Sequence, residues 1–174
     1  MNVQAWSVQR VHALADAQID GLADVLIDCV EGGASVSFMH PLSRERAVAF
    51  WRRVAQGVTA GERALVVAED AHGVCGTVQL MLDQPENQPH RAELVKMLVQ
   101  RRARRQGLGE ALLRAAEAAA RDCGKTLLVL DTANPEAERL YERMGWTRVG
   151  VIPGYALLPR GGLCSTTLYY RSLG

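Results

Sequence analysis

The stretch that most constrains the fold of this chain covers residues 91–132, where two apolar runs flank one amphipathic segment. Residues 91–99 (RAELVKMLV) and 126–132 (TLLVLDT) predict strands, because they are rich in apolar and β-branched side chains. Between them, apolar side chains recur at helical spacing from residue 107 to about 123. A strand–helix–strand connection joins two parallel neighbours in one sheet, so the sequence predicts a mixed α/β fold with a parallel strand pair.

The rest of the chain supplies further strands and helices on the same criteria of periodicity and turn residues. Additional strands are expected over residues 3–11, 64–70, 74–82, 146–152 and 164–173. Additional helices are expected over residues 19–33, 43–61 and 135–145. Consecutive strands joined by short turns pair antiparallel, so we expect a mostly antiparallel sheet. A chain of 174 residues without a linker-like segment predicts one domain, residues 1–174.

Charge and cysteine content exclude several classes of protein. Lys and Arg number 20 against 19 Asp and Glu, whereas a dedicated nucleic-acid binder is strongly basic. The cysteines at positions 29, 75, 123 and 164 have neither disulfide-framework nor metal-ligand spacing, so we expect no metal. The sequence has no secretory signal pattern and no apolar run of about 18 residues. We therefore expect a cytoplasmic protein that binds neither nucleic acid nor membrane.

A basic, glycine-containing turn separates the strand at 91–99 from the helix that follows. Gly107 and Gly109 allow the backbone to turn tightly and to point several N–H groups at one place, where the helix dipole adds about +0.5 of a charge. Four arginines are expected around that place: Arg101, Arg102, Arg104 and Arg105. Such a turn binds phosphate groups, although a solvated basic turn is the alternative. The Rossmann and P-loop glycine patterns are both absent from the sequence.

Two segments carry a resemblance to a known family. MLVQRRARRQGLGEAL resembles motif A of the GNAT superfamily of N-acetyltransferases, V-x-x-x-x-R-x-x-G-x-G, with Val99, Arg104, Gly107 and Gly109 in register. NPEAERLYERMGW is similar to a second segment of that family. Its matching residues are Asn134, Ala137, Leu140, Tyr141 and Gly145. The sequence departs from the family pattern at Arg101, where Pro is common, at Arg105, where Gly is common, and at Trp146, which replaces Phe.

The resemblance implies a GNAT-like fold with helices on both faces of the sheet and a parallel, splayed central strand pair. It implies acetyl-CoA as co-substrate, with the pantetheine arm against the splayed strand and the pyrophosphate on the turn. The cofactor-binding residues implied are Met97, Leu98, Val99, Arg104, Arg105, Gln106, Gly107, Leu108, Gly109, Glu110, Asn134 and Tyr141. The N–H of Leu98 is our candidate for contacting the thioester oxygen. Tyr141 matches the family position that protonates the leaving thiolate.

Two carboxylates lie within otherwise apolar strands. Glu93 enters the strand before the basic turn, and Asp131 ends the strand after the helix. A charge inside a strand costs stability unless it faces water or a ligand, so both side chains are candidates to face the acceptor amine. We assign Glu93 as the base and Asp131 as the substrate anchor, with solvent-facing strand residues as the alternative. If neither acts, His40 and His90 are the next candidates.

A closer resemblance covers nearly the whole chain. Residues 32–39, 91–99, 127–132 and 158–174 look like those of the tabtoxin resistance group of acetyltransferases, which inactivate a β-lactam amino-acid antimetabolite. The resemblance implies direct attack of a small-molecule amine on acetyl-CoA in a ternary complex, with a role in resistance or detoxification. The alternatives are acetylation of a protein N-terminus or lysine, an acyl-CoA sensor without turnover, and a nucleic-acid module. A monomer and a homodimer both fit the sequence.

Overall fold

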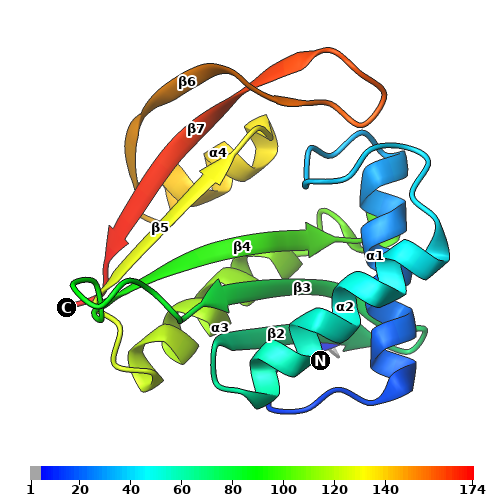
Figure 1. Cartoon of the computed structure of the whole chain (residues 1–174), viewed down its shortest axis with the longest axis horizontal. Helices are drawn as coiled ribbons and strands as arrows, with labels where there is room; N and C mark the ends of the chain where they lie inside the picture. The colour runs from blue at the N-terminus through cyan, green and yellow to red at the C-terminus, as the bar shows by residue number, and fades with distance from the viewer. Residues whose placement is uncertain (1–4) are drawn as a thin grey trace.

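The computed structural model describes residues 5–174 and contains one seven-stranded sheet with the order β1-β2-β3-β4-β5-β7-β6 (Figure 1). β4 and β5 are parallel and the other neighbouring pairs are antiparallel, which confirms the predicted fold class. The strands are β1 (Trp6–Val11), β2 (Arg63–Asp70), β3 (Gly73–Met81), β4 (Arg91–Val99), β5 (Leu127–Thr132), β6 (Thr147–Leu157) and β7 (Leu163–Ser172). The helices are α1 (Asp16–Glu31), α2 (Arg44–Thr59), α3 (Leu108–Asp122) and α4 (Pro135–Arg143), with a 3₁₀ turn η1 (Arg101–Ala103).

Several boundaries differ from the sequence prediction by a few residues, and one 3₁₀ turn was not predicted. Part of the first predicted strand, residues 3–4, lies outside the described residues, and β1 begins at Trp6. The predicted strand 146–152 continues as β6 to Leu157, because pairing with β7 resumes after an irregularity between Ile152 and Ala156. Pro153 in that interval lacks an N–H, so it interrupts the ladder without ending the strand. The turn η1 has no periodic pattern, and the sequence did not predict it.

Helices cover both faces of the sheet, as expected. On one face, α1 and α2 pack Leu22, Leu26 and Trp51 against β2 residues such as Leu65. On the opposite face, α3 packs its apolar side, including Leu112, against the alternate residues of β2, β3 and β4. Figure 1 shows α4 beside β5 and β7, away from α1 and α2. Successive side chains of β2 point to opposite faces of the sheet, so they contribute alternately to two cores, one on each face.

The sheet opens between β4 and β5. The two strands are in register over only three residue pairs, from Arg91 opposite Leu127 to Glu93 opposite Val129, and they diverge beyond them (Figure 1). Against β3, the register of β4 shifts so that β4 carries one extra residue between Val95 and Leu98, a β-bulge. The divergence leaves backbone groups of both strands without a strand partner and creates the fork that the resemblance implied.

Candidate active site

A cleft of about 1110 Å³ occupies the fork between β4 and β5. Its walls are the diverging strands, the turn and N-terminus of α3, helix α4, the loop 32–39 and the β6–β7 hairpin. Glu93, Asp131 and Tyr141 all line it, and so do the predicted cofactor-binding residues other than Gln106. The side chain of Gln106 instead donates to the Arg102 carbonyl over 3.2 Å. The structure therefore brings the residues singled out by sequence into one space.

The turn before α3 has the backbone geometry of an anion cradle. Gly107 is the N-cap of α3 with φ +78°, and Arg105 also has a positive φ, +59°. A Cβ on Gly107 would meet nothing within 4 Å, so its left-handed backbone rather than crowding calls for glycine. A Cβ on Gly109 would lie 3.2 Å from Leu140 Cδ2, so this glycine allows α4 to approach α3. The first N–H groups of α3 consequently face the cleft, ready for a phosphate group.

Two of the four arginines of this turn bind acidic residues elsewhere in the fold. Arg101 Nε donates to Asp28 Oδ1 on α1 over 2.9 Å. Arg102 forms an ion pair with Asp70 at the end of β2, and it lowers the pKa of that carboxyl below its ordinary value. Neither arginine lines the cleft. The expectation that all four surround the phosphate site is therefore wrong for these two, whose contacts fasten the turn to α1 and β2.

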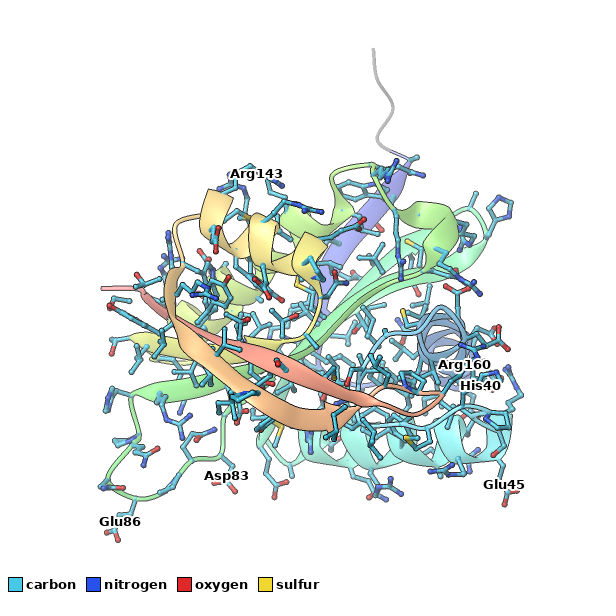
Figure 2. The ribbon with its side chains drawn as sticks, turned by 90° about the horizontal axis from the view of Figure 1, so that it is seen from above. His40, Glu45, Asp83, Glu86, Arg143 and Arg160 are labelled. Atoms are coloured by element: carbon cyan, nitrogen blue, oxygen red, sulfur yellow. The ribbon has the colours of Figure 1, made fainter. Side chains whose placement is uncertain are left out.

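The cofactor half of the cleft keeps a positive wall from other arginines. Arg104 and Arg105 line it, and Arg104 Nε donates to the Val99 carbonyl over 3.1 Å. Arg139 and Arg143, four residues apart on α4, also line it, and Figure 2 shows Arg143 on that helix. The sequence analysis missed this pair. Their i, i+4 spacing on a helix could have identified Arg139 and Arg143 from the sequence, because two like charges at this spacing repel each other unless an anion lies nearby.

The register of β4 corrects one backbone assignment. Leu98 lies opposite Thr77, and the N–H of Gln100 two residues later donates to a β3 carbonyl over 2.9 Å. Alternate residues of a strand direct their backbone groups to the same side, so the N–H of Leu98 points toward β3. Our assignment of that N–H to the thioester oxygen is therefore wrong. The neighbouring residues Met97 and Val99 present their backbone groups to the fork instead.

Tyr141 on α4 is buried at the floor of the cleft, with 3% of its surface exposed. Its ring centroid lies 5.7 Å from that of Trp146 and 5.8 Å from that of Tyr169. Burial, and then the negative charge of Asp131, raise the pKa of Tyr141 well above its ordinary value, so the phenol stays protonated. No hydrogen bond found among residues 5–174 involves its hydroxyl group. The phenol is thus a protonated donor that remains available to a bound molecule.

Glu93 and Asp131 lie on the same face of the sheet, on the two sides of the fork. Glu93 is in register with Val129, and Asp131 follows Val129 by two residues, so the three side chains point the same way. Asp131 accepts a hydrogen bond from Thr166 Oγ1 of β7 over 2.6 Å, which orients its carboxylate. Both carboxylates line the cleft from its strands, whereas the arginines that line it come from the turn before α3 and from α4. The part of the cleft beside the two carboxylates, called the acceptor end below, therefore suits a positively charged acceptor.

The two histidines named as reserve candidates lie outside the cleft wall. His90 is exposed before β4. His40 donates its backbone N–H to the Pro159 carbonyl over 2.8 Å, where the loop after α1 meets the β6–β7 hairpin. Beside it, Arg160 Nη1 donates to the Glu31 carbonyl over 2.9 Å (Figure 2). These contacts hold the β6–β7 hairpin against the C-terminal end of α1 and the loop that follows it.

Lys96 is the acceptor-end residue that the sequence analysis did not single out. It occupies the bulge of β4 with φ +52°, and its Nζ donates to Ser37 Oγ over 2.9 Å. The Nζ atom lies 5.9 Å from the centroid of the Phe50 ring. Burial lowers the pKa of Lys96, while Asp131 and Glu93 act in the opposite direction. A lysine within an apolar strand run was a signal of the kind that identified Glu93.

Comparison with known proteins agrees with this geometry. A model of the acetyltransferase (GNAT) family matches residues 29–146, a range that includes the fork, the turn before α3 and all of α4. The chain belongs to the GNAT family of acetyltransferases. Human N-acetyltransferase 8B and N-acetyltransferase 8 are 38% and 37% identical to it over 87 residues, 48% of this chain. The chain spans 38% of the length of these curated relatives.

Solved structures of other GNAT proteins share the fold. A phosphinothricin acetyltransferase from Sinorhizobium meliloti, in complex with acetyl-CoA, has a TM-score of 0.80 and 19% identity, covering 98% of this chain and 89% of its own. A ribosomal-protein-alanine N-acetyltransferase from Brucella melitensis has the same TM-score and identity, covering 95% and 99%. The first acts on a small molecule and the second on a protein, by their names, so overall fold similarity does not distinguish the two acceptor classes.

Residues 5–174 contain no group of three or more His, Cys, Asp or Glu side chains that could hold a metal ion. None of the helices described for this chain is long and apolar enough to cross a membrane. The four cysteines are free thiols, with Cys29 and Cys75 buried.

Proposed function

We propose that this protein transfers the acetyl group of acetyl-CoA to the amine of a small molecule by direct attack in a ternary complex. The main support for the proposal is that the groups needed for the reaction all line one continuous cleft. The anion cradle at Gly107 forms one end, the protonated Tyr141 lies along the floor, and the carboxylates of Glu93 and Asp131 lie at the other end. Each requirement of thioester aminolysis thus has a group in the same space.

The cofactor half fits a long, multiply phosphorylated thioester. Acetyl-CoA would supply the activated acetyl group, and the chain would supply binding, orientation and proton transfer. The N–H groups at the start of α3 and the guanidinium groups of Arg104 and Arg105 would hold the pyrophosphate. Backbone groups of Met97 and Val99 in the fork would pair with the pantetheine amides. We assign contact with the thioester oxygen to the N–H of Met97, in place of Leu98.

The acceptor half would manage the protons of the amine. An amine arrives largely as an ammonium ion and attacks only after losing a proton. Asp131, oriented by Thr166, would hold the ammonium, and Glu93 would accept its proton directly or through a water molecule. As the nitrogen–carbon bond forms and the carbon–sulfur bond breaks, Tyr141 would donate its proton to the departing thiolate, and the second proton lost by the nitrogen would return to the Tyr141 phenolate through a water molecule.

The finer part of the proposal concerns the acceptor. The resemblance of residues 32–39 and 158–174 to the tabtoxin resistance acetyltransferases favours a β-lactam amino acid or a similar antimetabolite, and hence a role in resistance. Both segments belong to the acceptor end, where the hairpin closes over the loop. Acetylation of a protein N-terminus or lysine and acyl-CoA sensing remain the competing functions. A single domain, a cytoplasmic location and a monomer or homodimer remain predictions of the same proposal.

The deciding experiment measures acetyl-CoA binding and thiol release separately. Calorimetric titration with acetyl-CoA tests the cofactor half. A thiol-release screen over amino acids, amino-β-lactams, polyamines and peptides with free N-termini tests the acceptor half. Release with small amines supports the proposal, and release with peptides alone supports a protein acceptor. Tight binding without release from any acceptor would make the protein a sensor.

A further inference from the structure

Lys96 places a positive charge among the carboxylates of the acceptor end. It follows Glu93 by three residues on β4, so their Cα atoms are at most about 10 Å apart, and both side chains line the cleft with Asp131. Its φ of +52° is unusual for a side chain other than glycine. The bulge that imposes this conformation also directs the side chain toward the loop 32–39, where Ser37 accepts its hydrogen bond. A charged side chain in a strained, half-buried position points to a role at the site.

The ammonium group of Lys96 has unused binding capacity. Within the described part of the chain, no carboxylate lies within ion-pair distance of it, and its polar partner is the neutral hydroxyl of Ser37. One hydrogen bond uses one of the three N–H donors of an ammonium group. The Phe50 ring offers a further weak attraction at 5.9 Å. A half-buried cation with two free donors is therefore a receptor for an anionic group.

We infer that Lys96 binds the carboxylate of the acceptor, which makes the acceptor a small zwitterionic amino acid. The inference rests on the proposed function and narrows its substrate class. Asp131 and Glu93 receive the ammonium end of such a molecule, and Lys96 with Ser37 receives the carboxylate end. A simple amine leaves Lys96 without a partner. A peptide N-terminus carries an amide where the free amino acid carries its carboxylate, so Lys96 also discriminates against protein acceptors.

A purely structural role for Lys96 is the competing explanation, because its contact with Ser37 holds the loop 32–39 to β4. That role affects every acceptor in the same proportion. Carboxylate recognition affects only acceptors that carry the carboxylate. The informative measurement is therefore the ratio of kcat/KM for an amino acid to kcat/KM for the corresponding carboxamide, which keeps the amine and removes the negative charge.

The experiment pairs each of the common amino acids and an amino-β-lactam acid with its carboxamide in the thiol-release assay. The wild-type protein is expected to prefer the acid of its best pair by about 10- to 100-fold, the range typical of a hydrogen-bonded charge pair in a partly buried site. Lys96→Gln should bring the ratio close to one by lowering kcat/KM for the acid alone. Lys96→Arg should keep most of the preference. Arg53→Gln removes the same charge from the exposed side of α2, outside the cleft, and should leave the ratio unchanged.

Failure of this inference differs from failure of the proposed function. If no acid, amide or peptide gives thiol release, the proposed function fails. If the wild-type protein acetylates amides as fast as acids, Lys96 is not a carboxylate receptor, and this comparison requires no folded variant. A Lys96→Gln protein that loses acid and amide turnover equally also overturns the inference. The inference is also overturned if the Lys96→Gln protein still prefers the acid over its carboxamide.

Discussion

Replacing Tyr141 by Phe removes one hydroxyl from the floor of the cleft and tests the proposed proton donor. Turnover should fall by about 10²- to 10⁴-fold, the usual contribution of a general acid. Stability should change by less than about 1 kcal/mol. The ring keeps its packing against Trp146 and Tyr169, and the hydroxyl has no hydrogen bond within residues 5–174 that the change would break. Affinity for acetyl-CoA should stay within about twofold, because the hydroxyl acts as the thiolate leaves.

Tyr169 offers a matched control 5.8 Å from Tyr141, ring centroid to ring centroid. It is also buried, and its hydroxyl donates to Glu142 Oε1 over 2.9 Å. Tyr169→Phe should lower the free energy of unfolding by about 1 kcal/mol through loss of that hydrogen bond, and it should leave kcat unchanged. Stopped-flow thiol release gives the rate of the chemical step, and urea denaturation gives stability. A change in kcat for Tyr169→Phe equal to that for Tyr141→Phe would show that the aromatic cluster, and not the Tyr141 hydroxyl, carries the effect.

The raised pKa of Tyr141 also predicts how the reaction rate depends on pH. Burial and Asp131 raise the pKa of Tyr141, so its phenol is protonated below that raised value and should not lose its proton up to about pH 10. With a carboxamide acceptor, which does not need the Lys96 charge, the wild-type rate should therefore rise with pH as the amine is deprotonated and then stay level. An unchanged kcat for Tyr141→Phe would refute its role as proton donor. A steep loss of that carboxamide rate between about pH 8 and 9 would contradict the protonation state that burial imposes on Tyr141.

The remaining predictions concern the two ends of the cleft. Gly107→Ala should lower the free energy of unfolding by about 1–2 kcal/mol, measured in urea, because φ is +78°; an unchanged midpoint would contradict the strain argument. Arg104→Ala should weaken acetyl-CoA binding in calorimetry, more at low than at high salt, whereas a salt-independent loss would argue against a phosphate contact. Glu93→Gln should lower kcat and flatten its rise with pH, and Asp131→Asn should chiefly raise the KM of the amine. Wild-type kinetics for both would remove the carboxylates from the mechanism.

Sequence patterns predicted the helices because their buried side chains recur every third or fourth residue, and they predicted β2 and β3 because these strands are continuous apolar runs buried on both faces. It could not predict the bulge of β4, since one extra residue in a strand leaves no mark on composition. That bulge sets the register at Leu98 and brings Lys96 to the acceptor end. The partners of Arg101 and Arg102 were also beyond reach, because Asp28 and Asp70 are distant in sequence. The local sequence pattern identifies the four arginines near the glycine turn. Contacts with distant segments of the chain decide which of these arginines are bound to acidic residues and which line the cleft.

The seam of three residue pairs between β4 and β5 has a consequence for the local stability of the sheet. Amide hydrogens on the fork side of β4 and β5 have no strand partner beyond the seam, so they should exchange with solvent much faster than those of the β2–β3 ladder. A molecule lying in the fork and pairing with the β4 backbone would slow exchange there. Such a ligand would take the place of a strand between β4 and β5. The two parts of the sheet would then open together, as one cooperative unit, only while the ligand is bound.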